Sequence, residues 1–137
     1  MKVIIETIPH ESQKYETVGD YWMEGDTLHI VVSELGDWKM EMLVAIHELA
    51  ETLIMLSDGV PLESSTVFDK EFESARAAWP GEIFRVTGKE YGPDYEPGDS
   101  PDAPYARQHT YATAVERILA GAMNVKWYEY EQACQNA

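Results

Sequence analysis

The chain has 137 residues, of which 45% are hydrophobic. This is the size of one ordinary domain, and we expect residues 1–137 to fold as a single domain around its own core. Asp and Glu number 25 against 10 Lys and Arg, which gives a formal net charge of -15. Such a surface repels phosphate groups, so the composition argues against binding to nucleic acid or to acidic membranes. It favours cations or basic partners instead.

Cysteine usage and the start of the sequence indicate a cytoplasmic protein. Cys134 is the only cysteine, and a single thiol forms neither an internal disulfide nor a thiolate metal site. The opening MKVIIETIPH has too short an apolar run for a signal peptide, and no run of about 18 apolar residues follows. We therefore expect a soluble cytoplasmic protein without a membrane segment.

The first third of the chain predicts a small β-sheet. The β-branched residues of 2–8 favour a strand that ends at Pro9. Two further β-rich runs flank Gly25-Asp26, a pair that favours a turn, so we expect a hairpin of 20–24 with 27–33. Together these segments predict a small N-terminal antiparallel sheet or hairpin.

Three helices are predicted after the sheet. The first has about 20 residues, with Asp37 as N-cap and Gly59 as stop signal. The second starts near Ser64 and ends at Pro80-Gly81; its apolar stripe at helical spacing consists of Phe68, Phe72, Ala75 and Trp79. The third covers about 104–123 and begins with a proline near its first position.

Two segments outside the helices complete the predicted α+β fold. Residues 80–104 contain five prolines and four glycines, which predicts a long loop, and long ordered loops often carry function. The tail is expected to add a short turn packed by Trp127 and Tyr128.

The stretch AIHELAETLIM, residues 45–55, places His47, Glu48 and Glu51 within an apolar helix. Residues four apart share a helix face, so His47 and Glu51 form a pair with metal-ligand geometry. Glu48 lies beside them, where a carboxylate can take a proton from a metal-bound water. On the alternative interpretation, the glutamates are solvated and His47 is a hydrogen-bonded core histidine. The sequence leaves both interpretations open.

The later helices offer further site residues. His109 lies seven residues before Glu116, on the same face of the third helix, and is the predicted third metal ligand. Asp69, on the second helix, is predicted to orient a ligand or to serve as a fourth one, whereas Glu73 fits a solvated acidic edge. Tyr105, one turn before His109, is a candidate hydrogen-bond donor to a substrate.

Two resemblances accompany these residues. The spacing HELAE resembles the His-Glu-x-x-His zinc motif of zincin metallopeptidases, with Glu51 in place of the second histidine. It implies a zincin-like arrangement, in which an edge strand before the zinc helix aligns the substrate. Most of the chain is also similar to a group of small uncharacterised bacteriophage and prophage proteins, through the segments TVGDYWMEGDTLHIVVSELGDW, HELAE, FDKEFE, EPGDSPDAPY and VERILA, with His109. That resemblance implies a clustered polar site and no particular reaction.

Three functions agree with these observations. The first is a zinc or other divalent-metal hydrolase, in its zincin-like version a peptidase, with His47, Glu51, His109 and Asp69 around the metal and Glu48 as general base. The second is a nucleotide pyrophosphohydrolase in which Glu48, Glu51, Asp69 and Glu73 hold magnesium. The third is a non-catalytic acidic phage protein that binds a host protein. The sequence does not identify a substrate.

Overall fold

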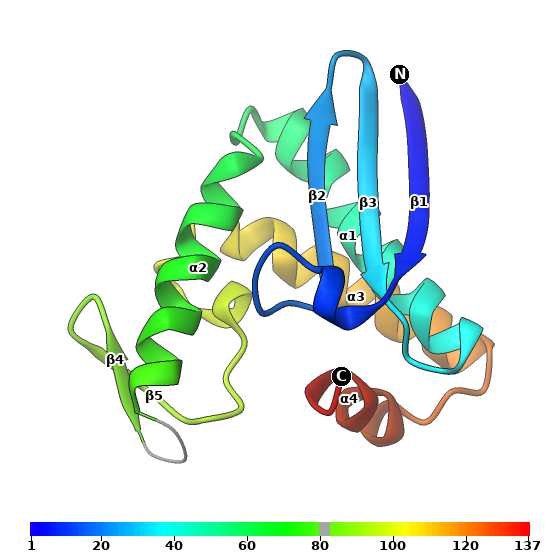
Figure 1. Ribbon diagram of the computed structural model, residues 1–137. Helices are drawn as coiled ribbons and strands as arrows, with labels where there is room; N and C mark the ends of the chain where they lie inside the picture. Colours follow the sequence, from blue (N-terminus) through cyan, green and yellow to red (C-terminus); the bar gives the residue numbers. More distant parts are fainter. Residues whose placement is uncertain (80–82) are drawn as a thin grey trace.

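The computed structural model describes residues 1–79 and 83–137 and has an α+β architecture (Figure 1). Within these residues a three-stranded sheet and a two-stranded sheet are combined with four α-helices. The elements follow in the order β1 (Lys2–Ile8), η1 (His10–Ser12), β2 (Gly19–Glu24), β3 (Thr27–Ser33), α1 (Trp38–Asp58), α2 (Glu63–Ala78), β4 (Phe84–Val86), β5 (Lys89–Tyr91), η2 (Pro97–Asp99), α3 (Ala106–Ala122) and α4 (Trp127–Gln135).

The N-terminal sheet is mixed rather than antiparallel. Its strand order is β1-β3-β2, with the predicted β2–β3 hairpin antiparallel and β1 parallel to β3. The prediction of an antiparallel sheet is therefore confirmed for the hairpin and wrong for β1. The physical reason is that β3 is the most buried strand, so it takes the centre and separates β1 from β2.

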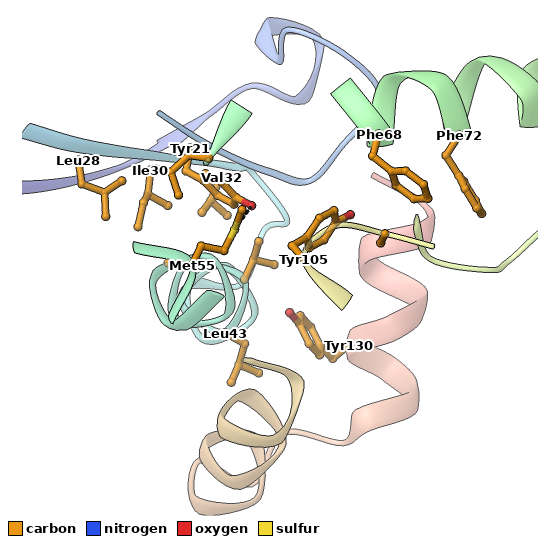
Figure 2. Close-up of a cluster of buried hydrophobic side chains, with 14 of the residues drawn as sticks. Tyr21, Leu28, Ile30, Val32, Leu43, Met55, Phe68, Phe72, Tyr105 and Tyr130 are labelled. Carbon is orange, nitrogen blue, oxygen red and sulfur yellow. Dashed lines mark hydrogen bonds between the residues drawn. The ribbon is translucent and has the colours of Figure 1, made fainter. Parts of the chain in front are cut away.

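The main core lies between the sheet and α1. Leu28, Ile30 and Val32 alternate along β3 and point toward α1, where Met55 lies closest to them (Figure 2). Leu43 belongs to the same core cluster but lies on the side of α1 that faces away from β3. The three side chains of β3 and Met55 are buried, as expected for one face of a sheet covered by one stripe of a helix. This packing fixes α1, which carries the HELAE motif.

The first helix agrees with its predicted ends. The Asp37 side chain accepts a hydrogen bond of 2.9 Å from the Lys39 backbone N–H, and Gly59 adopts the left-handed conformation at the C-terminal end. The N-cap satisfies an amide that the helix itself leaves free, and glycine takes the left-handed conformation without steric cost. The predicted helix of about 20 residues is confirmed.

The second helix supports a separate aromatic cluster. Phe68 and Phe72 are buried as predicted, and Ala75 is half-buried. Trp79 is 58% exposed, so its assignment to the stripe was wrong. The helix ends at Ala78, and the non-helical backbone of Trp79 turns its side chain away. The predicted stop at Pro80-Gly81 lies outside the described residues.

The segment predicted as a long loop contains a hairpin of its own. Strands β4 and β5 pair through a tight turn in which Thr87 and Gly88 both have positive φ. The rings of Phe84 and Tyr91 lie 5.1 Å and 4.9 Å from that of Phe72, which anchors the hairpin on α2. The prediction of a loop without strands was wrong here because prolines and glycines on both sides mask two three-residue strands.

The C-terminal third contains two helices instead of one. Helix α3 begins at Ala106, two residues after the predicted Pro104, and the predicted short turn of the tail is the nine-residue helix α4. Tyr130 is its buried residue, whereas Tyr128 is exposed, so the predicted packing by Tyr128 was wrong. Within residues 1–79 and 83–137, each helix is too short or too polar to cross a membrane.

Candidate metal centre

The centre is built on α1 and α3, which pack along each other. His47 and Glu51 are one turn apart on α1, and His109 comes from the first turn of α3. All three side chains are buried; Glu51 is 3% exposed. The helical period therefore brings two polar residues of α1 to the buried interface with α3, where His109 meets them.

Three ligand-type atoms converge at this interface: helix spacing predicted the His47–Glu51 pair, and the packing of α3 on α1 adds His109. His109 Nδ1 lies 3.0 Å from Glu51 Oε2 and 3.1 Å from His47 Nε2, and His47 Nε2 lies 3.3 Å from Glu51 Oε2. We call these atoms the inner triad. In a tetrahedral zinc site with bonds of about 2.0–2.1 Å, neighbouring ligand atoms lie about 3.3 Å apart. The triad thus has the spacing that one divalent ion requires.

Side chains from other elements hold two members of the triad. His47 Nδ1 donates a 2.8 Å hydrogen bond to the Glu116 carboxylate, which also accepts one from the Tyr130 hydroxyl. Glu51 Oε1 accepts a 2.7 Å hydrogen bond from the Tyr21 hydroxyl on β2. Carboxylate partners of this kind fix the orientation and tautomer of a ligating histidine.

Hydrogen bonds within the triad and to Glu116 outweigh the cost of burial for His47 and Glu51. Burial lowers the pKa of His47, but hydrogen bonds to Glu116 and Glu51 raise it to about 10. Burial alone would raise the pKa of Glu51, yet hydrogen bonds from His109 and His47 lower it to about 2. These hydrogen bonds favour a protonated His47 beside an ionised Glu51. A divalent ion could replace a ring proton of His47.

Glu48 lies beside the triad and has a different environment. Burial and the negative charge of Glu51 raise the pKa of Glu48 from 4.5 to about 8. Its side chain packs against Gly19 at the start of β2, where a Cβ atom would lie 2.8 Å from Glu48 Cγ and Cδ. Only glycine leaves room for Glu48 in this position.

Asp69 lies at the same cavity but outside the triad. Its carboxylate accepts hydrogen bonds from the hydroxyls of Tyr105 and Tyr15, the second at 3.3 Å. Burial raises its pKa from 3.8 to about 7. Among the described residues, the groups that could share one ion do not include Asp69. The predicted roles of Asp69 as ligand or orienter and of Tyr105 as substrate donor stay predictions.

One cavity connects these groups. It has a volume of about 480 Å³, and its lining includes the triad, Glu48, Asp69 and Tyr105. Glu73 also lines it, but its carboxylate lies 3.6 Å from the Arg76 guanidinium, as fits an acidic edge residue. The candidate residues of α1, α2 and α3 therefore face one partly open cavity, large enough for part of a substrate.

Several residues around the centre were missed from the sequence. Tyr21, Tyr130, Glu96 and Asp99 all contact the triad or its partners. No spacing rule connects them to His47, because none of them lies on α1. Two signals pointed to the segment of Glu96 and Asp99 without naming either residue: its prolines and glycines, which predicted a long loop, and the resemblance through EPGDSPDAPY.

Comparisons of the chain with protein-family models, curated proteins and solved structures gave no match. The case for function therefore depends on the geometry of the centre.

Proposed function

We propose that the protein is a divalent-metal-dependent hydrolase, with zinc as the best-fitting metal. His47, Glu51 and His109 would hold the ion through the inner triad, and Glu48 would act as general base. An ion of this kind activates a water for attack near neutral pH. Asp69 and Tyr105 line the cavity beside the base, where they would contact the substrate or the leaving group.

The observation that carries this proposal is that the outer polar atom of each of two ligands already has a hydrogen-bond partner, which leaves the inner atom free for a metal. His47 Nδ1 is bound to Glu116, and Glu51 Oε1 is bound to Tyr21. The atoms that remain are His47 Nε2 and Glu51 Oε2, and both point at His109 Nδ1. Partners that fix the outer atom of each ligand while the inner atoms converge are the usual surroundings of a metal site.

The charge of the cavity wall supports the same conclusion. Glu48, Glu51, Asp69 and Glu116 gather there; within the described residues Glu51 and Glu116 pair with histidines, whereas Glu48 and Asp69 have no ion pair. An ionised buried carboxylate without a positive partner is costly. A divalent cation would offset this charge and would lower the pKa of Glu48 into the range where it is ionised at neutral pH.

Peptide or amide bonds are the proposed substrate class. Strand β2 is an edge of the sheet, and it reaches the cavity at Gly19, directly beside Glu48. This placement supports a zincin-like arrangement, in which an extended substrate lies along an edge strand next to the base. The many carboxylates of the wall disfavour phosphate-bearing substrates.

The magnesium alternative has less support. It requires Glu48, Glu51, Asp69 and Glu73 to share an ion, yet within the described residues the ion-sharing groups contain Glu51 but not the other three. The centre also contains two imidazoles, which magnesium rarely accepts. The third hypothesis, a phage-encoded protein that binds a basic host surface, has the charge of -15 as its motivation.

Metal content of matched variants tests the proposal. Wild-type protein, purified without chelator and measured by elemental mass spectrometry, should carry zinc. His47→Ala should lose it, because a ligand is gone. Glu48→Gln should retain it and should lose about 10²- to 10⁴-fold in rate against a panel of amide substrates, because only the base is removed. Glu71→Gln, an exposed change on α2, is the control for lost charge.

Two outcomes would contradict the proposal. If Glu48→Gln empties the centre as completely as His47→Ala does, Glu48 is itself a ligand and the centre is a carboxylate-rich one. If wild-type protein takes up no divalent ion even when zinc is supplied, the cluster is structural, and the host-binding hypothesis becomes the better one.

A further inference from the structure

The outer nitrogen of His109 lacks a well-directed partner. Its Nε2 atom is buried and makes no aligned hydrogen bond, although the ring is only 6% exposed. The nearest acceptors are Glu96 Oε2 at 3.3 Å and Asp99 Oδ1 at 3.4 Å. A buried N–H that is not well bonded is costly, so this arrangement needs a physical reason.

The other histidine of the triad provides an internal comparison. The outer nitrogen of His47 has one carboxylate partner, Glu116, aligned at 2.8 Å. The outer nitrogen of His109 has two carboxylates, both farther away and neither aligned. One carboxylate suffices to orient a histidine. Two carboxylate oxygens and one imidazole nitrogen that face one another offer instead three ligand atoms for a cation.

The η2 turn brings these carboxylates to the ring. Glu96 and Asp99 flank Pro97-Gly98, and Gly98 packs on the imidazole so closely that a Cβ atom would lie less than 3.0 Å from three ring atoms. The Tyr95 hydroxyl donates a 2.9 Å hydrogen bond to the Asp99 carbonyl and holds the turn. Both carboxylates are more than half exposed, and each still places one oxygen within 3.4 Å of the buried nitrogen.

We propose that Glu96, Asp99 and His109 Nε2, the outer group, bind a second divalent cation. Their ligand atoms all lie within 4.8 Å of one another. This second site rests on the proposed function, in which His109 Nδ1 binds the first ion. His109 would then bind one ion through each ring nitrogen and would release its ring proton to solvent. Imidazole with two carboxylates suits zinc or manganese.

The second ion would exchange with solvent more readily than the first and would have a structural rather than a catalytic role. The outer group is at the exposed side of His109, so its ion should dissociate more readily than the buried one. Two ions on opposite nitrogens of one ring lie about 6 Å apart with bonds of about 2.0 Å. This exceeds the roughly 4 Å of sites whose two ions activate one water. The second ion would instead fix the η2 turn over the cavity.

The test is zinc stoichiometry in the full chain, measured by calorimetric titration of chelator-treated protein and by elemental analysis. Wild-type protein should bind two zinc ions, the second at least about tenfold more weakly. The double variant Glu96→Gln/Asp99→Asn should bind one ion with the affinity of the tighter site. The matched control is Glu90→Gln/Asp102→Asn, which removes the same charge from the same segment, where the two carboxylates pair with Arg85 and Lys89. It should retain two.

The outcomes separate this inference from the proposed function. One ion in wild-type protein, unchanged in the double variant, would overturn the second site and leave the first intact. No ion in wild-type protein would overturn both. Titration with Cu²⁺ gives an independent measurement, because two copper ions joined by one imidazolate couple magnetically and lose resonance intensity. Additive, uncoupled signals would overturn the bridge.

Discussion

Gly98 offers a direct way to move His109 without changing any ligand. A Cβ atom at this position would lie less than 3.0 Å from three atoms of the imidazole ring. Nonbonded carbon atoms normally approach to about 3.5–4.0 Å, so Gly98→Ala should displace the ring or the turn by about 1 Å. Ligand distances in metal sites tolerate only about 0.2 Å. We therefore expect zinc affinity of the inner triad to fall at least about 10- to 100-fold, the range seen when surrounding partners are lost.

The assay is competition for zinc between the protein and a chelating dye, with circular dichroism to verify folding. Gly121→Ala is the control, because a Cβ atom there meets nothing within 4 Å. It should leave zinc affinity unchanged and should stabilise α3 by up to about 1 kcal/mol. A folded Gly98→Ala protein that binds zinc as tightly as wild type would refute the assignment of His109 as a ligand in the position described.

Three further predictions concern the core, the hydrogen bonds and the titration of the centre. Phe72→Ala should lower the free energy of unfolding by about 3–5 kcal/mol in urea, because the ring is fully buried; a loss under about 1 kcal/mol would contradict its central position. Tyr21→Phe removes the donor to Glu51 Oε1 and should weaken zinc binding about 10- to 100-fold by the same dye competition, and unchanged affinity would mean that the hydroxyl does not position the ligand. Burial raises the pKa of Glu48 from 4.5 to about 8 and that of Asp69 from 3.8 to about 7. At a pH between the ordinary and the raised value of each group, the folded state therefore binds more protons than the unfolded chain. The stability of metal-free protein should therefore fall as pH rises from about 5 to 8, and Glu48→Gln/Asp69→Asn should flatten this slope; an equal slope in the variant would argue against these pKa shifts.

The part of the site that follows the helix period could be predicted from the sequence. His47 and Glu51 share a face because they are four residues apart, and the ends of α1 were marked by Asp37 and Gly59. His109 could be placed on one face of the third helix with Glu116 by the same rule. Its position beside His47 depends on how α1 and α3 pack, which the spacing alone does not determine.

The partners of the ligands could not be predicted, for a physical reason. Tyr21 and Tyr130 belong to different elements, and a buried tyrosine that packs looks the same in sequence as one that donates to a carboxylate. The direction of β1 was likewise invisible, because alternation within a strand does not state which neighbour it pairs with. Glu96 and Asp99 were hidden in a segment whose prolines and glycines indicate only a loop.

The hydrogen bonds from Tyr130 to Glu116 and from Glu116 to His47 join the last helix to the first. A zinc ion that fixes His47 would thereby restrict α4, although α4 itself supplies no atom to the inner triad. In native-state hydrogen exchange, the amides of α4 should consequently slow together with those of α1 and α3 when zinc is added, as one cooperative unit. Proteolysis of the C-terminal segment should slow in parallel when zinc is added. Resistance of α4 to cleavage would therefore measure metal binding at a centre to which α4 contributes no ligand.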